Sequence, residues 1–180
     1  MRSLRLLLLP FCALALFAVG CSETPTSSTV TLGKTTLAEF MTNAGYMAWY
    51  QTGYDVYPFT EDQAAFDAAV ATIEANLGEV GADYQMLMVI KPNCGCQHTQ
   101  REMPRVMKTL DAAGFSQDDI EIWLTDSPLN GIGDIKTAHS IDTAPTFLLL
   151  RNGVELGRLE VDEEIPGADV ATQLASFFDN

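Results

Sequence analysis

Two short apolar runs on either side of an amphipathic helix constrain the fold of this chain more than any other feature. Residues Tyr84–Ile90 (YQMLMVI) and Ile120–Thr125 (IEIWLT) are long enough for buried strands and too short for helices. Between them, apolar residues recur at helical spacing up to Gly114, where the helix is expected to end. A strand, a helix and a strand of these lengths predict a right-handed βαβ unit.

The C-terminal part is expected to add a hairpin and two helices. Asn152-Gly153 separates two runs of strand character, Thr146–Leu150 and Val154–Val161, and this dipeptide favours a type I′ turn between antiparallel strands. A short helix is predicted near Asp134–His139 and an amphipathic one over Ala168–Phe178. The predicted order is β-α-β-α-β-β-α, which is an α/β fold class.

The residues ahead of these strands are predicted to be helical. Apolar positions at three- and four-residue spacings begin at Leu37. Thr60-Glu61-Asp62-Gln63 has the pattern of a capping box that opens a second helix. Residues 37–80 would thus form a helical extension of a domain that spans 81–180. Four aromatic residues in this extension are expected to pack in the core rather than bind a ligand: Trp49, Tyr50, Tyr54 and Tyr57.

Residues 1–20 have the composition of a secretion signal. Arg2 and Arg5 precede an apolar stretch that is too short to cross a hydrocarbon core of about 30 Å comfortably. The stretch closes on Ala18-Val19-Gly20-Cys21, which resembles a bacterial lipobox and implies that Cys21 is acylated and becomes the N-terminus. Ordinary signal-peptidase cleavage nearby is the alternative. Ser22 is similar to the sorting pattern for the outer membrane, facing the periplasm.

Residues 21–36 would carry the lipid anchor and a flexible linker to the folded part. The segment is rich in Thr and Ser and lacks apolar periodicity. Loss of the leader changes the formal charge from −14 to −16, because two arginines leave with it. No nucleic-acid partner is expected, since phosphate recognition requires a basic face.

Two of the four cysteines are left as thiols in the mature chain. Cys12 lies in the leader and Cys21 would carry the lipid, which leaves Cys94 and Cys96 in a turn-rich loop after the first predicted strand. Cysteines one residue apart stabilise a fold very little, because the loop that they close is tiny. In an oxidising compartment the pair therefore indicates chemistry.

The order of elements, with a cysteine pair at the first strand-to-helix turn, resembles thioredoxin. Thr143-Ala144-Pro145-Thr146 precedes the third strand of the unit, where thioredoxins carry a cis-proline, and Leu150–Arg158 is similar to their closing hairpin. Residues 96–104 (CQHTQREMP) match in spacing the Cys-x-x-Cys-x-x-Glu-Met-Pro start of membrane-tethered periplasmic thioredoxins of the TlpA and ResA kind. The resemblance covers about Tyr84–Asn180. It implies a thioredoxin-like three-layer fold with a central mixed sheet flanked by helices.

The resemblance gives the two cysteines unequal roles. Cys96 takes the attacking position at a helix N-terminus, where exposed N–H groups and the macrodipole lower the pKa of a thiol. Cys94 would resolve the mixed disulfide from the preceding loop. Thr99 stands where the family usually has its resolving cysteine and is expected to donate a hydrogen bond to the Cys96 thiolate. His98 matches the histidine of Cys-Gly-His-Cys in protein disulfide isomerase, which favours the reduced form.

Further site residues follow from the small ring that a Cys-Gly-Cys disulfide would close and from the same resemblance. Gly95 tolerates the distorted backbone of a Cys-Gly-Cys ring, whose strain implies easy reduction. Pro145 would shape the substrate groove, and Thr143 and Ala144 would offer backbone groups to an extended peptide. The expected function is thiol–disulfide exchange with protein thiols or disulfides of the cell envelope, as an oxidant or isomerase rather than a strong reductant. No bound cofactor is expected.

Two other functions stay open at the level of sequence. Cys94, Cys96 and His98 alternate, and thiolates with an imidazole suit Cu(I) or Zn(II), although zinc would need a fourth ligand. His139 is the one other histidine, and a capping or surface role is expected for it. A thioredoxin-like domain without redox activity would instead serve as a binding module.

Overall fold

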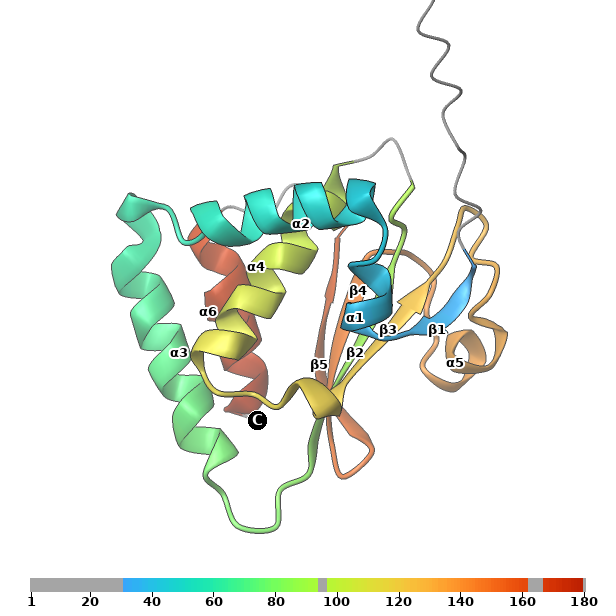
Figure 1. Ribbon diagram of the computed structural model, residues 1–180. Helices are drawn as coiled ribbons and strands as arrows, with labels where there is room; N and C mark the ends of the chain where they lie inside the picture. Colours follow the sequence, from blue (N-terminus) through green and yellow to red (C-terminus); the bar gives the residue numbers. More distant parts are fainter. Residues whose placement is uncertain (1–30, 94–96, 162–166, 180) are drawn as a thin grey trace, which may run out of the picture.

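The computed structural model describes residues 31–93, 97–161 and 167–179. These residues form an α/β fold around a five-stranded mixed sheet of order β1-β3-β2-β4-β5 (Figure 1). The strands are β1 (Gly33–Thr35), β2 (Tyr84–Ile90), β3 (Ile120–Leu124), β4 (Thr146–Arg151) and β5 (Val154–Glu160). The helices are α1 (Leu37–Phe40), α2 (Ala44–Val56), α3 (Gln63–Leu77), α4 (His98–Ala112), α5 (Gly133–Ala138) and α6 (Gly167–Phe178), with short 3₁₀ turns η1 (Thr60–Asp62) and η2 (Gln117–Asp119).

The predicted βαβ unit and hairpin are confirmed. β2 and β3 are parallel, with Ile90 opposite Leu124, and α4 connects them. Gly114 follows α4 with a φ of 74°, a backbone conformation that residues other than glycine rarely adopt. β4 pairs antiparallel with both β2 and β5. Asn152 and Gly153 both have positive φ, as a type I′ turn requires.

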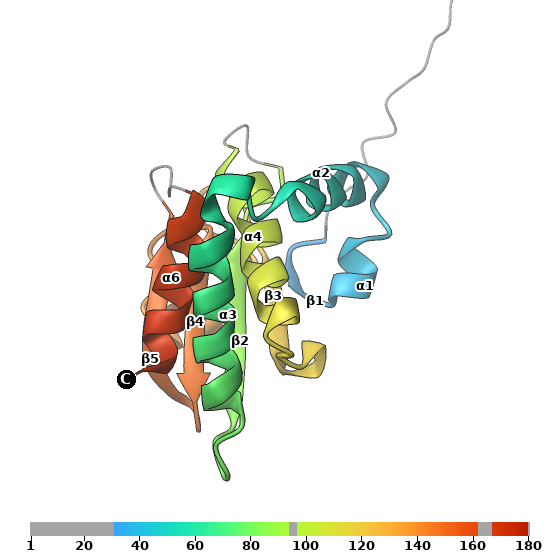
Figure 2. The same cartoon turned by 90° about the vertical axis from the view of Figure 1, so that its left-hand side faces the viewer.

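The sheet separates two apolar clusters of unequal size. On one face, α3, α4 and α6 cover the sheet (Figure 2). Side chains such as Met86, Met88 and Phe147 are almost completely buried in this cluster. On the other face, α5 and its flanking loops cover a smaller cluster that includes Leu87 and Leu148. The result is three layers, in which the second outer layer is thin because α5 has only six residues.

The helices predicted over residues 37–80 pack on the larger cluster. α3 lies against α6, and α2 lies against α4. Gly53 permits this approach of α2, because a Cβ at Gly53 would lie 2.8 Å from Cγ of Pro104 in α4. Tyr50 and Tyr57 are buried, as expected for core aromatic residues. No helix of the described residues is long and apolar enough to span a membrane.

Two expected elements differ from the structure at their boundaries. The predicted linker ends earlier, because Gly33–Thr35 pair with β3 as an antiparallel edge strand. Such a strand is held by backbone hydrogen bonds and needs no apolar periodicity. A polar sequence of this kind therefore gives no pattern from which the strand could be predicted. The helical region from Leu37 is divided into α1 and α2. Asn43 starts α2 by accepting hydrogen bonds from the N–H groups of Gly45 and Tyr46.

The predicted capping box at Thr60 is wrong, and a capping box occurs at Thr36 instead. Thr36 Oγ1 accepts a hydrogen bond from Glu39 N–H at 3.1 Å, and Glu39 Oε2 accepts one from Thr36 N–H at 3.0 Å. These bonds lower the pKa of Glu39. Thr60–Asp62 form a 3₁₀ turn, and no side chain caps it or the start of α3. The same short pattern begins at Thr36, Thr60 and Thr99, and of these three places only the turn into α1 forms a capping box.

Tyr54 joins α2 to α4, and its ionisation is expected to weaken the fold at high pH. Its hydroxyl donates to Asp111 Oδ2 at 2.7 Å. Burial, together with the hydrogen bond to Asp111 and the charge of that residue, raises the pKa of Tyr54 from 10.0 to about 12. The folded chain thus holds this proton more tightly than the unfolded chain does. The contribution of protonated Tyr54 to the free energy of unfolding is complete below pH 10 and is lost as the pH rises toward 12.

Urea unfolding at several pH values checks this expectation. The midpoint should fall between pH 10 and 12, and Tyr54→Phe should show a smaller fall over the same window, since the substituted ring does not ionise. An equal fall in both proteins would place the alkaline sensitivity elsewhere.

Candidate functional site

The predicted site lies between the end of β2 and the start of α4. Cys94, Gly95 and Cys96 lie outside the described residues, so the roles predicted for them stay predictions. Asn93 and Gln97 are the described residues that flank them. The carboxyl ends of the parallel strands β2 and β3 meet here, which is where open α/β sheets commonly bind ligands.

His98 and Thr99 form the beginning of α4. Thr99 is fully buried, and its Oγ1 accepts a hydrogen bond from the backbone N–H of Lys91 at 3.2 Å. Thr99 therefore ties the first turn of α4 to the residue that follows β2. His98 is half-buried at the first helical position. The hydrogen bond predicted between Thr99 and Cys96 involves a residue outside the described ranges.

Pro145 is brought to the same end of the sheet. The expected cis peptide bond between Ala144 and Pro145 is present. Thr146 lies opposite Val89 in the β2–β4 pair, and this register places Pro145 beside the last residue of β2. The proline therefore lies beside the end of β2, the strand that precedes α4 in the chain.

The backbone near Pro145 is partly engaged by the protein itself. The carbonyl of Pro145 accepts a hydrogen bond from Val161 N–H at 3.0 Å. The Thr143 carbonyl accepts one from Thr146 Oγ1 at 2.9 Å, and the side chain of Ala144 is buried in the smaller cluster. Of the groups predicted to bind a peptide, the Thr143 carbonyl thus already has an intramolecular donor.

Arg158 of β5 holds the segment that leads to Pro145. Its Nη2 donates to the carbonyl of His139 at 2.8 Å and to Glu155 Oε2 at 2.6 Å. The hydrogen bond that Arg158 donates to the Glu155 carboxylate is the main reason why the pKa of Arg158 is raised. His139 ends α5 and is half-buried, which agrees with the capping or surface role expected for it. The sequence contains no local signal for the bond from Arg158 to His139, because that carbonyl belongs to another segment of the chain.

Tyr46 of α2 contacts the residue before the cysteine pair. Its hydroxyl donates to Asn93 Oδ1 at 2.7 Å. The ring of Tyr46 is buried and stacks on Phe40, with the centroids 4.9 Å apart. Burial raises the pKa of Tyr46, so the hydroxyl stays a donor at neutral pH. No sequence pattern indicated a role for Tyr46 at this loop, since an aromatic side chain on a helix is usually part of the core.

Removal of the Tyr46 hydroxyl should loosen the loop next to Asn93. We expect Tyr46→Phe to lower the free energy of unfolding by about 1 kcal/mol and to increase amide hydrogen exchange at Lys91 and Asn93. Tyr54→Phe is the matched control, because Tyr54 bonds to Asp111 near the other end of α4. Equal exchange at these amides in both variants would show that general packing of α2 controls the loop.

Two pockets include the described residues that flank the cysteine-containing segment, one pocket on each side. One, of about 210 Å³, includes Asn93 in its lining, and the other, of about 470 Å³, lies between α2 and α4 and includes Gln97. The first is lined by Leu32, Lys91, Pro92, Asn93, Thr125, Asp126 and Ser127. The second is lined by Ala48, Trp49, Thr52, Gly53, Gln97, Gln100 and Arg101.

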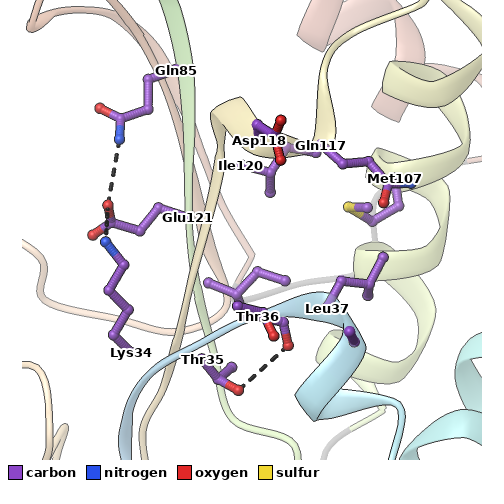
Figure 3. A pocket seen from close by; sticks show the side chains of 12 residues that line it. Lys34, Thr35, Thr36, Leu37, Gln85, Met107, Gln117, Asp118, Ile120 and Glu121 are labelled. Atoms are coloured by element: carbon purple, nitrogen blue, oxygen red, sulfur yellow. Dashed lines mark hydrogen bonds and ion pairs between the residues drawn. The ribbon is translucent and has the colours of Figure 1, made fainter.

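A third pocket, of about 390 Å³, is lined mainly by residues of β1, α1, η2 and β3 (Figure 3). It arises because β1 pairs only with residues 122–124, so no strand covers the first half of β3 on that side. Lys34 and Gln85 both bond to Glu121 beside it, with Lys34 Nζ 2.7 Å from Glu121 Oε2. Its described lining includes none of the predicted site residues.

The predicted metal site is only partly described. Within residues 31–93, 97–161 and 167–179, no group of three His, Cys, Asp or Glu side chains is close enough to hold a metal ion. Two of the three predicted ligands, Cys94 and Cys96, lie outside those ranges. His98, the third, is at the start of α4.

Comparisons with known proteins identify no family for this chain. No family model and no curated protein matches it. Among solved structures, an HIV epitope-scaffold shares 13% identity with a TM-score of 0.41 and covers 81% of this chain and 98% of its own. A protein of unknown function from Pseudomonas aeruginosa shares 15% identity with a TM-score of 0.35, over 81% of this chain and 91% of that one. These TM-scores are too low to support an argument about fold family or function.

Proposed function

We propose that this protein is a thioredoxin-like thiol–disulfide oxidoreductase of the cell envelope, with Cys94 and Cys96 as its redox pair. The register of β4 against β2 carries the proposal, because it brings Pro145 to the end of β2 where the cysteine segment begins. Support also comes from the strand order and from α4, which starts directly after that segment. The residue that precedes the cysteine pair and the cis-proline therefore lie at the same end of the sheet, which is the arrangement that the resemblance implies.

The start of α4 favours thiolate chemistry. The helix has fifteen residues and no acidic residue in its first turn, so no carboxylate there opposes a nearby negative charge. Partial positive charge at a helix N-terminus lowers the pKa of a neighbouring thiol. Cys96, two residues before the first helical residue, is the cysteine placed to benefit.

The exchange proceeds in two steps. The Cys96 thiolate attacks a substrate disulfide, forms a mixed disulfide and releases one substrate thiolate. Cys94 then attacks the Cys96 sulfur, which releases the second substrate thiolate and leaves a Cys94–Cys96 disulfide. The substrate gains the two electrons that the cysteine pair loses. In the opposite direction the disulfide form oxidises a substrate dithiol, and the strain of a small ring favours this direction.

A thiol-trapping titration against redox buffers tests the proposal. The mature chain should show one two-electron transition, and neither Cys94→Ser nor Cys96→Ser should show it. Stoichiometric metal release when the thiols are blocked would favour the metal site. Absence of both would overturn the redox function and leave a binding module.

We also propose that Cys21 carries the lipid that holds the protein at the envelope membrane. Replacement of Cys21 by Ser should move the protein from the membrane fraction to the soluble envelope fraction. Cys12→Ser is the matched control, since it changes a leader cysteine and keeps the lipobox. Unchanged membrane association of Cys21→Ser would show that the protein is held in another way.

A further inference from the structure

The chain enters the fold at the end of the sheet where the cysteine segment begins. β1 is antiparallel to β3, and Gly33 lies opposite Leu124. Leu124 in turn lies opposite Ile90, the last residue of β2. Two strand spacings therefore separate Gly33 from Ile90, a distance of roughly 10 Å. Leu32 lines the same hollow as Asn93, the residue directly before Cys94.

The opposite end of the molecule is formed by the loop before β2 and the β4–β5 hairpin (Figure 1). These two segments are joined, because Arg151 Nη2 lies 2.6 Å from Glu79 Oε2 and Asp83 N–H donates to Asn152 Oδ1 at 3.2 Å. Val80 in this loop is fully exposed. The length of β2 separates the two ends by roughly 20 Å, at about 3.3 Å per residue.

The length of chain between Cys21 and Leu32 limits how far the domain can lie from a lipid anchor. A segment of this length reaches at most about 40 Å when fully extended. This reach is similar to the size of the folded domain, so the end at which the chain enters stays nearer to the membrane than the opposite end.

Charge gives the domain little reason to adsorb to the bilayer in another orientation. The mature chain has 24 acidic residues and a formal charge of −16. The surfaces of biological membranes are commonly anionic and attract basic segments instead. The anchor, and not adsorption of a side of the domain, is therefore the main determinant of orientation.

We infer that the lipid anchor keeps the cysteine-bearing end of the domain directed toward the membrane. Its partners are then polypeptides whose thiols or disulfides lie within about 40 Å of the bilayer surface, such as the membrane-proximal segments of membrane proteins. For such partners the anchor raises the effective concentration of the site, an advantage that it does not give for proteins free in solution. This inference rests on the lipidation of Cys21.

Energy transfer from two labelled positions tests the orientation. In a full chain with Cys94→Ser and Cys96→Ser, single thiols are introduced by Ser127→Cys or Val80→Cys. Ser127 is exposed and lines the hollow next to Leu32, whereas Val80 is at the opposite end. Each lipidated variant carries the same donor fluorophore and is inserted into phosphatidylcholine vesicles that contain an acceptor-labelled lipid. We expect energy transfer from position 127 to exceed that from position 80 at least about twofold, since roughly 20 Å of strand separates the two ends.

Each outcome has a distinct meaning. Equal transfer from both positions, with vesicle association intact, would overturn the inference and leave the anchor in place. Failure of the lipidated chain to associate with vesicles would remove the anchor and the inference together. Thiol exchange is measured separately, because these chains lack Cys94 and Cys96. A flexible insertion of roughly forty residues after Ser27 should abolish the difference in energy transfer between positions 127 and 80, since a longer tether lets the domain rotate freely. If the difference persists, the tether does not set the orientation.

Discussion

Cys96→Ser is expected to form no mixed disulfide with protein substrates, whereas Cys94→Ser should accumulate them. Cys96 precedes α4 by two residues, so the field of the helix N-terminus favours its thiolate over that of Cys94. Loss of Cys94 removes the group that would release the substrate, and the mixed disulfide therefore persists. Acid quenching, followed by non-reducing electrophoresis and mass spectrometry, measures both outcomes.

Alkylation rates give a second measurement of the same difference. If the pKa of Cys96 is one unit lower than that of Cys94, its thiolate fraction below both pKa values is roughly tenfold higher. Iodoacetamide should then modify Cys96 first. The double variant with both cysteines replaced by Ser is the baseline. Mixed disulfides in Cys96→Ser and none in Cys94→Ser would reverse the assignment and make Cys94 the attacking thiol.

Glu102→Gln is expected to lower the free energy of unfolding by about 3–5 kcal/mol, the usual cost of breaking a buried ion pair. The Glu102 side chain is only 1% exposed. Its carboxylate lies 2.5 Å from Arg101 Nε and 3.3 Å from Arg105 Nη1. The Arg105 guanidinium is also buried, and it lies 5.7 Å from the centroid of the Tyr57 ring. An amide in place of the carboxylate would remove the negative charge that Glu102 contributes to these buried contacts with Arg101 and Arg105.

Glu79→Gln is the matched control for this prediction. Glu79 pairs with Arg151 at 2.6 Å, but more than half of the Glu79 side chain is exposed. Water and ions already screen such a pair, so the expected loss is below about 1 kcal/mol. Urea unfolding of both variants provides the comparison. Equal losses of unfolding free energy in the two variants would show that the contacts of Glu102 with Arg101 and Arg105 contribute no more than a surface ion pair.

The main strands, the hairpin and the closing helix could be predicted because their signals are local. The apolar run of Tyr84–Ile90, the positive-φ requirement of Asn152-Gly153 and the periodicity of Ala168–Phe178 each depend on a few neighbouring residues. The structure has β2, the β4–β5 turn and α6 at these places. Residue patterns of this kind act through short-range physical preferences, and so the sequence reports them directly.

Other predictions depended on a resemblance and not on local patterns. The cis bond before Pro145 is one of them, and it is present. The roles of Cys94, Cys96 and Gly95 are others, and they stay predictions to be tested by the cysteine variants. Sequence spacing brings these residues into consideration, but it does not describe the surroundings that set their reactivity.

Local sequence determined the order and type of the main elements, because periodicity and turn chemistry act within a few residues. Tertiary structure alone decided the rest. Gly33–Thr35 became a strand only because β3 offered a free edge, and Tyr46 acquired a role at the cysteine loop only because α2 lies next to Asn93. Arg158 likewise holds the loop before Pro145 through partners outside its own neighbourhood in sequence. Such contacts join residues far apart in the chain, and their energy depends on geometry that no short pattern of residues encodes.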